Sequence, residues 1–104
     1  MSQRYLTDTH DITGILSTSY AGTTTLAPLS SSTSIEVICT HEQTGTEVVI
    51  TATDDAISGS ETGAYTAAVG AATFTEAGRY ARRVVVEWGV ESRTYPDVVL
   101  TVLA

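Results

Sequence analysis

The stretch SIEVICTHEQTGTEVVITAT, from Ser34 to Thr53, decides the fold class of this chain. Its first half alternates apolar and polar residues, so Ile35, Val37 and Cys39 share one face of an extended strand. Its second half alternates again, and the intervening Glu42-Gln43-Thr44-Gly45 has the length and the glycine of a hairpin loop. The pattern predicts two antiparallel strands with one apolar face directed into a core.

The same alternation recurs on both sides of this hairpin. It predicts strands at 24–29, 34–41, 46–53, 64–69, 79–88 and 95–103, without the apolar spacing of a helix. In the longest of them Tyr80, Val84, Val86 and Trp88 share a face with Arg82, and we expect Trp88 to anchor the core. About seven strands without crossover helices predict an all-β, antiparallel sandwich, with a small barrel as the main alternative.

The first part of the chain has a different composition. Residues 1–23 are rich in Thr, Ser and Gly, with a weak apolar patch at Ile12, Ile15 and Leu16. We expect an N-terminal arm with one short edge strand there, and a sandwich core over residues 24–104. The 104 residues form one domain, because too little chain remains to enclose a second core.

Composition and charge narrow the classes of function. With 42% hydrophobic and 16% charged residues the chain is expected to fold. Its net charge of −7 repels phosphate backbones and anionic lipids, so we expect no nucleic acid and no membrane as partner. The single cysteine, Cys39, excludes an intrachain disulfide and is expected in the core. The first residues lack the apolar segment of a signal peptide, so a cytoplasmic origin is expected.

One short motif resembles a known family. Residues Glu76-Ala77-Gly78-Arg79-Tyr80-Ala81-Arg82 are similar to the acid-x-Gly-x-Tyr-x-Cys motif of immunoglobulin-like domains, with Arg82 in place of the cysteine. The resemblance implies an immunoglobulin-like sandwich of about seven strands without its disulfide. It also implies that the Tyr80 ring is buried and that its hydroxyl bonds to backbone upstream, which makes Tyr80 a structural corner residue alongside the anchor Trp88.

A wider resemblance extends from Gly22 to Asp97. Several elements follow one another as in the immunoglobulin-like modules of tailed-bacteriophage structural proteins, such as the N-terminal domain of upper baseplate proteins. They are Gly22 with Leu26 and Leu29, then residues 44–48, 62–65, 76–80 and 94–97. The resemblance implies a non-enzymatic virion subunit (capsid decoration, head–tail neck or tail component), assembled in the host cytoplasm. Its partners would be other virion proteins or copies of itself in a multimeric assembly.

Four of the five cations lie close together in the sequence: Arg79, Arg82, Arg83 and Arg93. Guanidinium groups bind carboxylates through two parallel hydrogen bonds, so these residues are a candidate interface to an acidic neighbour or to a second copy. The alternative is that Arg82 and Arg83 are solvated or paired within the chain.

The chain offers little for chemistry. We predict no catalytic residue, no cofactor and no metal site, since His10 and His41 lie in no motif. Cys39 and His41 are two residues apart on a strand and form the one conceivable dyad, although Cys39 fits the core better. The acidic loop 54–61 offers oxygens to calcium without the spacing of an EF-hand. The alternative function is a stand-alone recognition module that binds carbohydrate or a cell-surface ligand through its loops.

Overall fold

The computed structural model describes residues 2–54 and 63–103. The chain is all-β, as its sequence predicts, with one short 3-10 turn, Leu29–Ser31, in the described part. The strands are β1 (Ser2–Tyr5), β2 (Ile12–Ile15), β3 (Ser17–Tyr20), β4 (Thr23–Leu26), β5 (Ser34–His41), β6 (Glu47–Asp54), β7 (Ala64–Ala67), β8 (Gly78–Trp88) and β9 (Glu91–Leu103).

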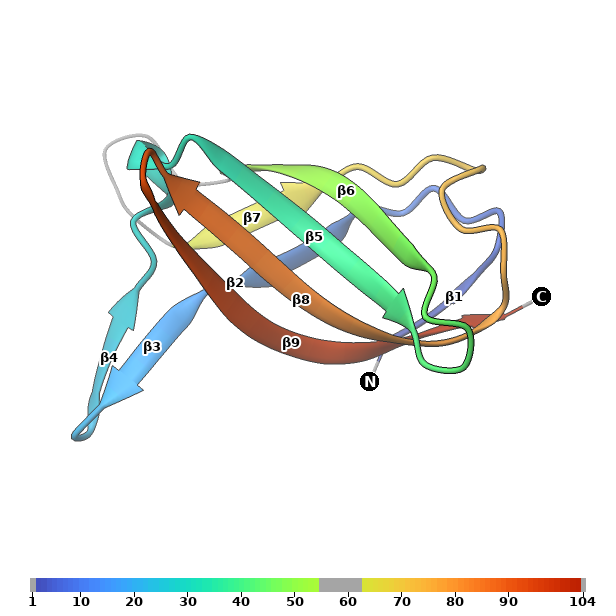
Figure 1. The fold of residues 1–104 in the computed structure, drawn as a ribbon, viewed down its shortest axis with the longest axis horizontal. Coiled ribbons are helices and arrows are strands. Elements are labelled where there is room, and N and C mark those ends of the chain that lie inside the picture. The colour runs from blue at the N-terminus through green and yellow to red at the C-terminus, as the bar shows by residue number, and fades with distance from the viewer. Residues whose placement is uncertain (1, 55–62, 104) are drawn as a thin grey trace.

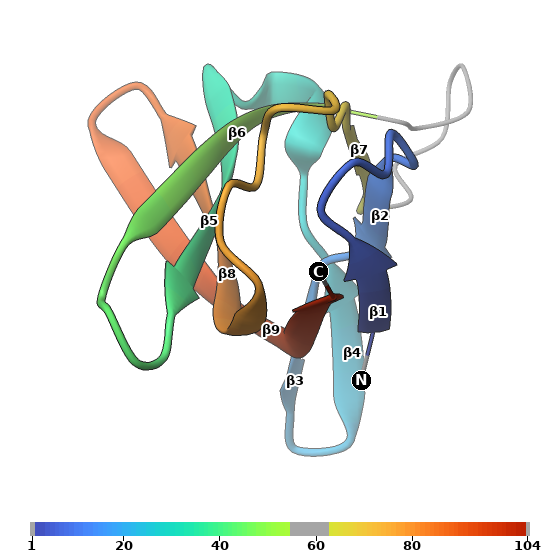
Figure 2. The same ribbon diagram turned by 90° about the vertical axis from the view of Figure 1, so that its right-hand side faces the viewer.

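Seven of these strands form one curled sheet in the order β1-β9-β8-β5-β6-β7-β2, and β3 pairs with β4 in a separate hairpin (Figure 1). Neighbouring strands are antiparallel except β1 and β9, which run parallel with Arg4 opposite Val102. The sheet curls, so that its two edge strands, β1 and β2, lie on the same side of the molecule (Figure 2). Residues of both strands line one cavity. The strands are thus joined in one mixed sheet, where the sequence predicted an antiparallel sandwich.

The N-terminal segment differs most from expectation. Residues 1–23 were predicted to form an arm with one short edge strand, but β1 and β2 occupy opposite edges of the main sheet. The partner of β1 is the C-terminal end of the chain, since Tyr5 lies opposite Leu103. A pairing over such a separation leaves no local pattern in the sequence, so alternation alone does not predict it.

The core lies inside the curl, where the alternation of the central strands directs their apolar side chains. In the β5–β6 hairpin Val37 lies opposite Ile50, and both side chains are buried. In β8 the predicted inward face is confirmed, because Tyr80, Val84 and Val86 are buried while their neighbours are more exposed.

Strand β9 begins earlier than predicted. It follows a two-residue turn directly at Glu91, so Pro96 lies within the strand rather than at its start. The pairing of β8 with β9 shifts register between Ala81 and Arg83, next to the position where Pro96 pairs with Arg83. Proline lacks a backbone N–H and is tolerated at such irregularities, which explains its place inside a strand.

Candidate functional site

The turn before β8 is closed by a tyrosine. Tyr80 is 1% exposed, and its hydroxyl donates a hydrogen bond of 2.7 Å to the backbone carbonyl of Glu76. Burial raises the pKa of this hydroxyl above its ordinary value of 10.0, and the nearby Glu76 carboxylate and Cys39 raise it further. Tyr80 is therefore a neutral donor at neutral pH, and the corner that the sequence motif predicts is confirmed.

His41 holds the other side of this corner. Its ring packs edge-on against Tyr80 at a centroid distance of 4.9 Å. Nδ1 accepts hydrogen bonds from the backbone N–H groups of Gln43 and Thr44, so the proton lies on Nε2, which donates to the carbonyl of Ala77 at 3.0 Å. Both nitrogens serve the backbone, which leaves no free base for the conceivable dyad with the buried Cys39.

No three His, Cys, Asp or Glu side chains among residues 2–54 and 63–103 gather closely enough to hold a metal ion. The candidate calcium loop, residues 54–61, lies outside the described residues from position 55 onward. None of the described residues belongs to a helix that is long and apolar enough to cross a membrane.

The predicted arginine interface is divided by the fold. Arg79 and Arg83 lie on the outer face of β8, where Arg79 pairs with Glu42 at 3.7 Å and Arg83 pairs with Glu47 at 3.1 Å. Arg82 points to the opposite, inner face and is 9% exposed, while Arg93 lies exposed on β9. The four guanidinium groups therefore form no single surface. An interface role for Arg79, Arg83 and Arg93 stays a prediction.

The β3–β4 hairpin projects away from the curled sheet (Figure 1). Its turn is Ala21-Gly22, both with positive φ (52° and 83°), which is the backbone that a tight two-residue hairpin turn requires. Two backbone hydrogen bonds hold the root of the hairpin: the N–H of Leu16 donates to the carbonyl of Gly63, and the N–H of Ala27 donates to the carbonyl of Leu16. Its described side chains, those of Ser17, Thr18, Thr23, Thr25 and Leu26, are all exposed.

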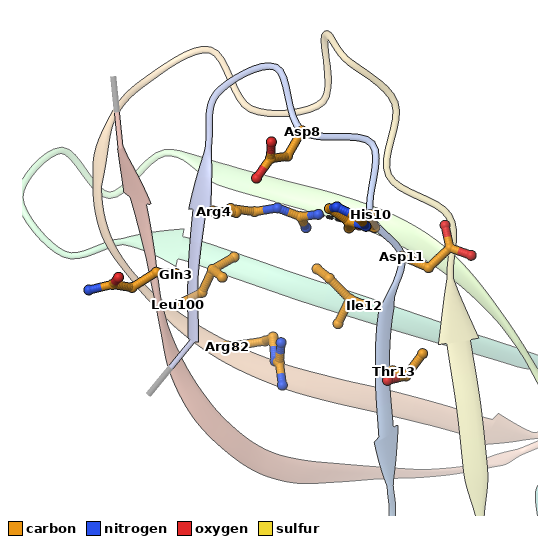
Figure 3. Close-up of a pocket in the computed structure, with 9 residues that line it drawn as sticks. All are labelled: Gln3, Arg4, Asp8, His10, Asp11, Ile12, Thr13, Arg82 and Leu100. Atoms are coloured by element: carbon orange, nitrogen blue, oxygen red, sulfur yellow. Dashed lines mark hydrogen bonds between the residues drawn. The ribbon is translucent and has the colours of Figure 1, made fainter.

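A cavity of about 300 Å³ lies between the two edge strands of the sheet (Figure 3). Arg4 from β1 and Ile12 from β2 line its two sides, and Arg82 and Leu100 contribute from the strands behind. Asp8, His10 and Asp11 from the β1–β2 connection complete it, with Gln3 and Thr13. We call it the seam cavity. It brings together the two arginines that the curl buries, Arg4 at 7% and Arg82 at 9% exposure.

A second pocket, of about 400 Å³, lies at the β8–β9 turn. It is lined by Pro28, Trp88, Glu91 and Arg93. Trp88 packs against the core but is only partly buried, and its Nε1–H donates to the carbonyl of Pro28 at 3.0 Å. Trp88 therefore packs against one end of the core but is only partly buried, where the sequence predicted a core anchor.

The sequence did not predict that Arg4 lines a cavity, because residues 1–23 were expected to form an arm. Arg4 becomes an inward residue only because β1 pairs with β9, a contact across nearly the whole chain. The inward direction of Arg82, in contrast, follows from the alternation of β8. No signal in the sequence places the two arginines in one cavity, since the curl of the sheet brings them there.

No protein-family model, no curated protein and no solved structure matches this chain. Four features of the described residues bear on its function: the exposed hairpin, the edge strands β1 and β2, the seam cavity and the Trp88 pocket.

Proposed function

We propose that this chain is a non-enzymatic structural subunit that acts through protein–protein contacts with copies of itself. The observation that carries the proposal is the β3–β4 hairpin, which stands away from the sheet with all its described side chains exposed (Figure 2). A two-stranded hairpin is marginally stable by itself in water, and three or more strands or a packed face are needed. A neighbouring subunit would supply that support.

The hairpin also lacks the features that keep exposed strands apart. Natural edge strands are protected by charged side chains, proline or bulges. Residues 17–26, with the sequence STSYAGTTTL, contain no charged residue and no proline. Ile15 and Leu26 at the root of the hairpin are 68% and 41% exposed, which adds apolar surface. The composition favours a hairpin that docks on another chain.

The same chain also has sheet edges to which a strand of the hairpin could add, namely those of β1 and β2. Strands β1 and β2 each pair on one side only within the described residues, β1 with β9 and β2 with β7. Their outer edges offer unpaired backbone groups to an added strand. A donor hairpin and an acceptor edge at different places on one chain give a head-to-tail contact, which builds rings or filaments.

Within this proposal the assembly is part of a bacteriophage virion, as capsid decoration, head–tail neck or tail component. The support is the sequence resemblance to immunoglobulin-like phage modules, together with the bond from Tyr80 to Glu76 that this resemblance predicts. Kinship with the immunoglobulin-like sandwich is part of the same proposal. Rings and tubes of one small subunit suit a neck or tail.

The experiment places charges on the hairpin. The variant Thr18→Lys with Thr25→Glu puts opposite charges on two residues that lie across from each other, so the hairpin itself keeps an attractive pair. Thr51→Lys, on the exposed face of β6, is the matched control, because β6 is already paired on both sides. Light scattering is expected to show multimers for the wild type and the control, and monomers for the hairpin variant. Equal masses for all three would refute the proposal.

A second candidate function rests on the Trp88 pocket. The apolar face of a sugar stacks on an indole ring, and flanking carboxylate and guanidinium groups such as Glu91 and Arg93 bond its hydroxyls. The chain has a single tryptophan, so its fluorescence reports directly on this pocket. A saturable change of emission on titration with oligosaccharides, absent in Arg93→Met, supports carbohydrate recognition. An emission that no sugar changes removes it.

A further inference from the structure

We propose that the seam cavity is a binding site for a carboxylate group, with Arg4 as the residue that recognises it and Arg82 beside it. This inference is independent of the hairpin and holds for the isolated subunit. Figure 3 shows the two arginines on either side of the space that Leu100 and Ile12 also line. The sequence gives no prediction of such a site.

The state of Arg4 is the first argument. Its Nη2 donates to the carbonyl of His10, and its guanidinium carbon lies 5.7 Å from the centre of the Phe74 ring. Its Nε is buried without a hydrogen-bond partner, and Arg4 forms no ion pair with a carboxylate of the described residues. Buried guanidinium groups are normally paired and fully hydrogen-bonded. Among the described residues, Arg4 is therefore a buried cation without a directly paired carboxylate.

The position of Arg82 is the second argument. It lies where the β8–β9 pairing shifts register, and such irregularities redirect side chains and occur beside binding sites. Its side chain lines the same cavity as Arg4. A second guanidinium group therefore faces the space beside Arg4.

The acids of the cavity restrict the ligand. Asp8 and Asp11 line the seam cavity, and the Oδ2 of Asp8 accepts the N–H of Tyr5 at 2.8 Å. These carboxylates repel a second negative charge on a ligand, which disfavours a dianion such as phosphate. A planar monoanion fits the fork of an arginine through two parallel hydrogen bonds. The space of about 300 Å³ accommodates a small organic acid or a single acidic side chain.

The test measures stabilisation by carboxylates. A ligand that binds only the folded state raises the melting temperature in proportion to ln(1 + [L]/Kd). At low salt we expect propionate to raise the melting temperature of the wild type with this logarithmic dependence on concentration, and to leave the melting temperature of Arg4→Met unchanged. Arg79→Met, which removes an exposed arginine of the outer face, is the matched control and should respond like the wild type. No response of the wild type, or an equal response of Arg4→Met, overturns the proposal.

Two further arms make the result specific. Arg4→Lys keeps the charge without the fork, and we expect it to fold and to bind propionate at least about tenfold more weakly, since the lysine is a point charge. Phosphate at equal ionic strength should stabilise less than propionate, and a stronger effect of phosphate overturns the carboxylate assignment. Glutamate with both backbone ends blocked separates the sources. If blocked glutamate binds more tightly than propionate, the natural ligand is a protein side chain. If the two bind equally, the natural ligand is a free acid.

Discussion

The hydroxyl of Tyr80 reaches back 2.7 Å to the carbonyl of Glu76, and the ring of His41 packs edge-on against the same tyrosine. These contacts fix the turn that starts β8, the inner strand on which Arg82 and Trp88 are placed. The position of the seam cavity and of the Trp88 pocket thus depends on one corner of the fold.

Tyr80→Phe removes the bond to Glu76 and leaves the ring in place. The net contribution of such a bond is about 1 kcal/mol, so we expect a loss of about that size in the free energy of unfolding. Urea denaturation of the two proteins measures it. A loss below about 0.3 kcal/mol would show that the corner bond does not hold the turn.

The same tyrosine makes stability depend on high pH. Because burial raises the pKa of Tyr80 in the folded state, the unfolded chain loses this proton first as the pH rises past 10.0. The contribution of the neutral Tyr80 hydroxyl to the free energy of unfolding is complete below pH 10.0, and it is lost as the pH rises toward the pKa of the folded state. Urea denaturation of both proteins above and below pH 10.0 is the measurement. We expect the advantage of the wild type over Tyr80→Phe to shrink at the higher pH, and an advantage that grows there would contradict the raised pKa.

Gly78 is expected to tolerate no side chain. Its φ of +139° is rare for other residues, and an added Cβ would lie directly against the ring of His41. We expect Gly78→Ala to cost about 3 kcal/mol or more, from strain and overpacking together. Gly45→Ala is the control, because φ there is +76° and no atom lies within 4 Å of the added Cβ, so about 1 kcal/mol is lost. Equal losses for the two variants would contradict the role assigned to His41.

Trp88→Ala separates partial from full burial. A fully buried tryptophan costs about 3–5 kcal/mol on truncation, but the Trp88 ring is partly at the surface. A buried apolar area on the order of 100–150 Å² corresponds to about 2.5–4 kcal/mol, which chemical denaturation can measure. A loss above about 4 kcal/mol would place the ring wholly inside and would close the pocket proposed for sugars.

Local pattern predicted the centre of this fold well and its edges poorly. The inward faces of β5, β6 and β8 follow from alternation, because one side of each strand must be buried. The parallel pairing of Arg4 with Val102 does not, since no short-range rule links the two ends of the chain. Alternation along β8 places Arg82 on the inner face. The inner position of Arg4 depends on the β1–β9 pairing, which alternation does not predict. The arginines that lie close together in the sequence do not share one surface, because Arg82 and Arg83 alternate to opposite faces of β8.

Hydrogen exchange of the hairpin amides tests the central claim, assembly through the β3–β4 hairpin, most directly. In dilute protein we expect the amides of residues 17–26 to exchange rapidly, because two unsupported strands open easily, while those of β5 and β8 are protected. At concentrations where light scattering shows multimers, the hairpin amides should become protected. Hairpin amides that exchange equally fast in the multimer and in the monomer, or a protein that stays monomeric at every concentration, would contradict the account.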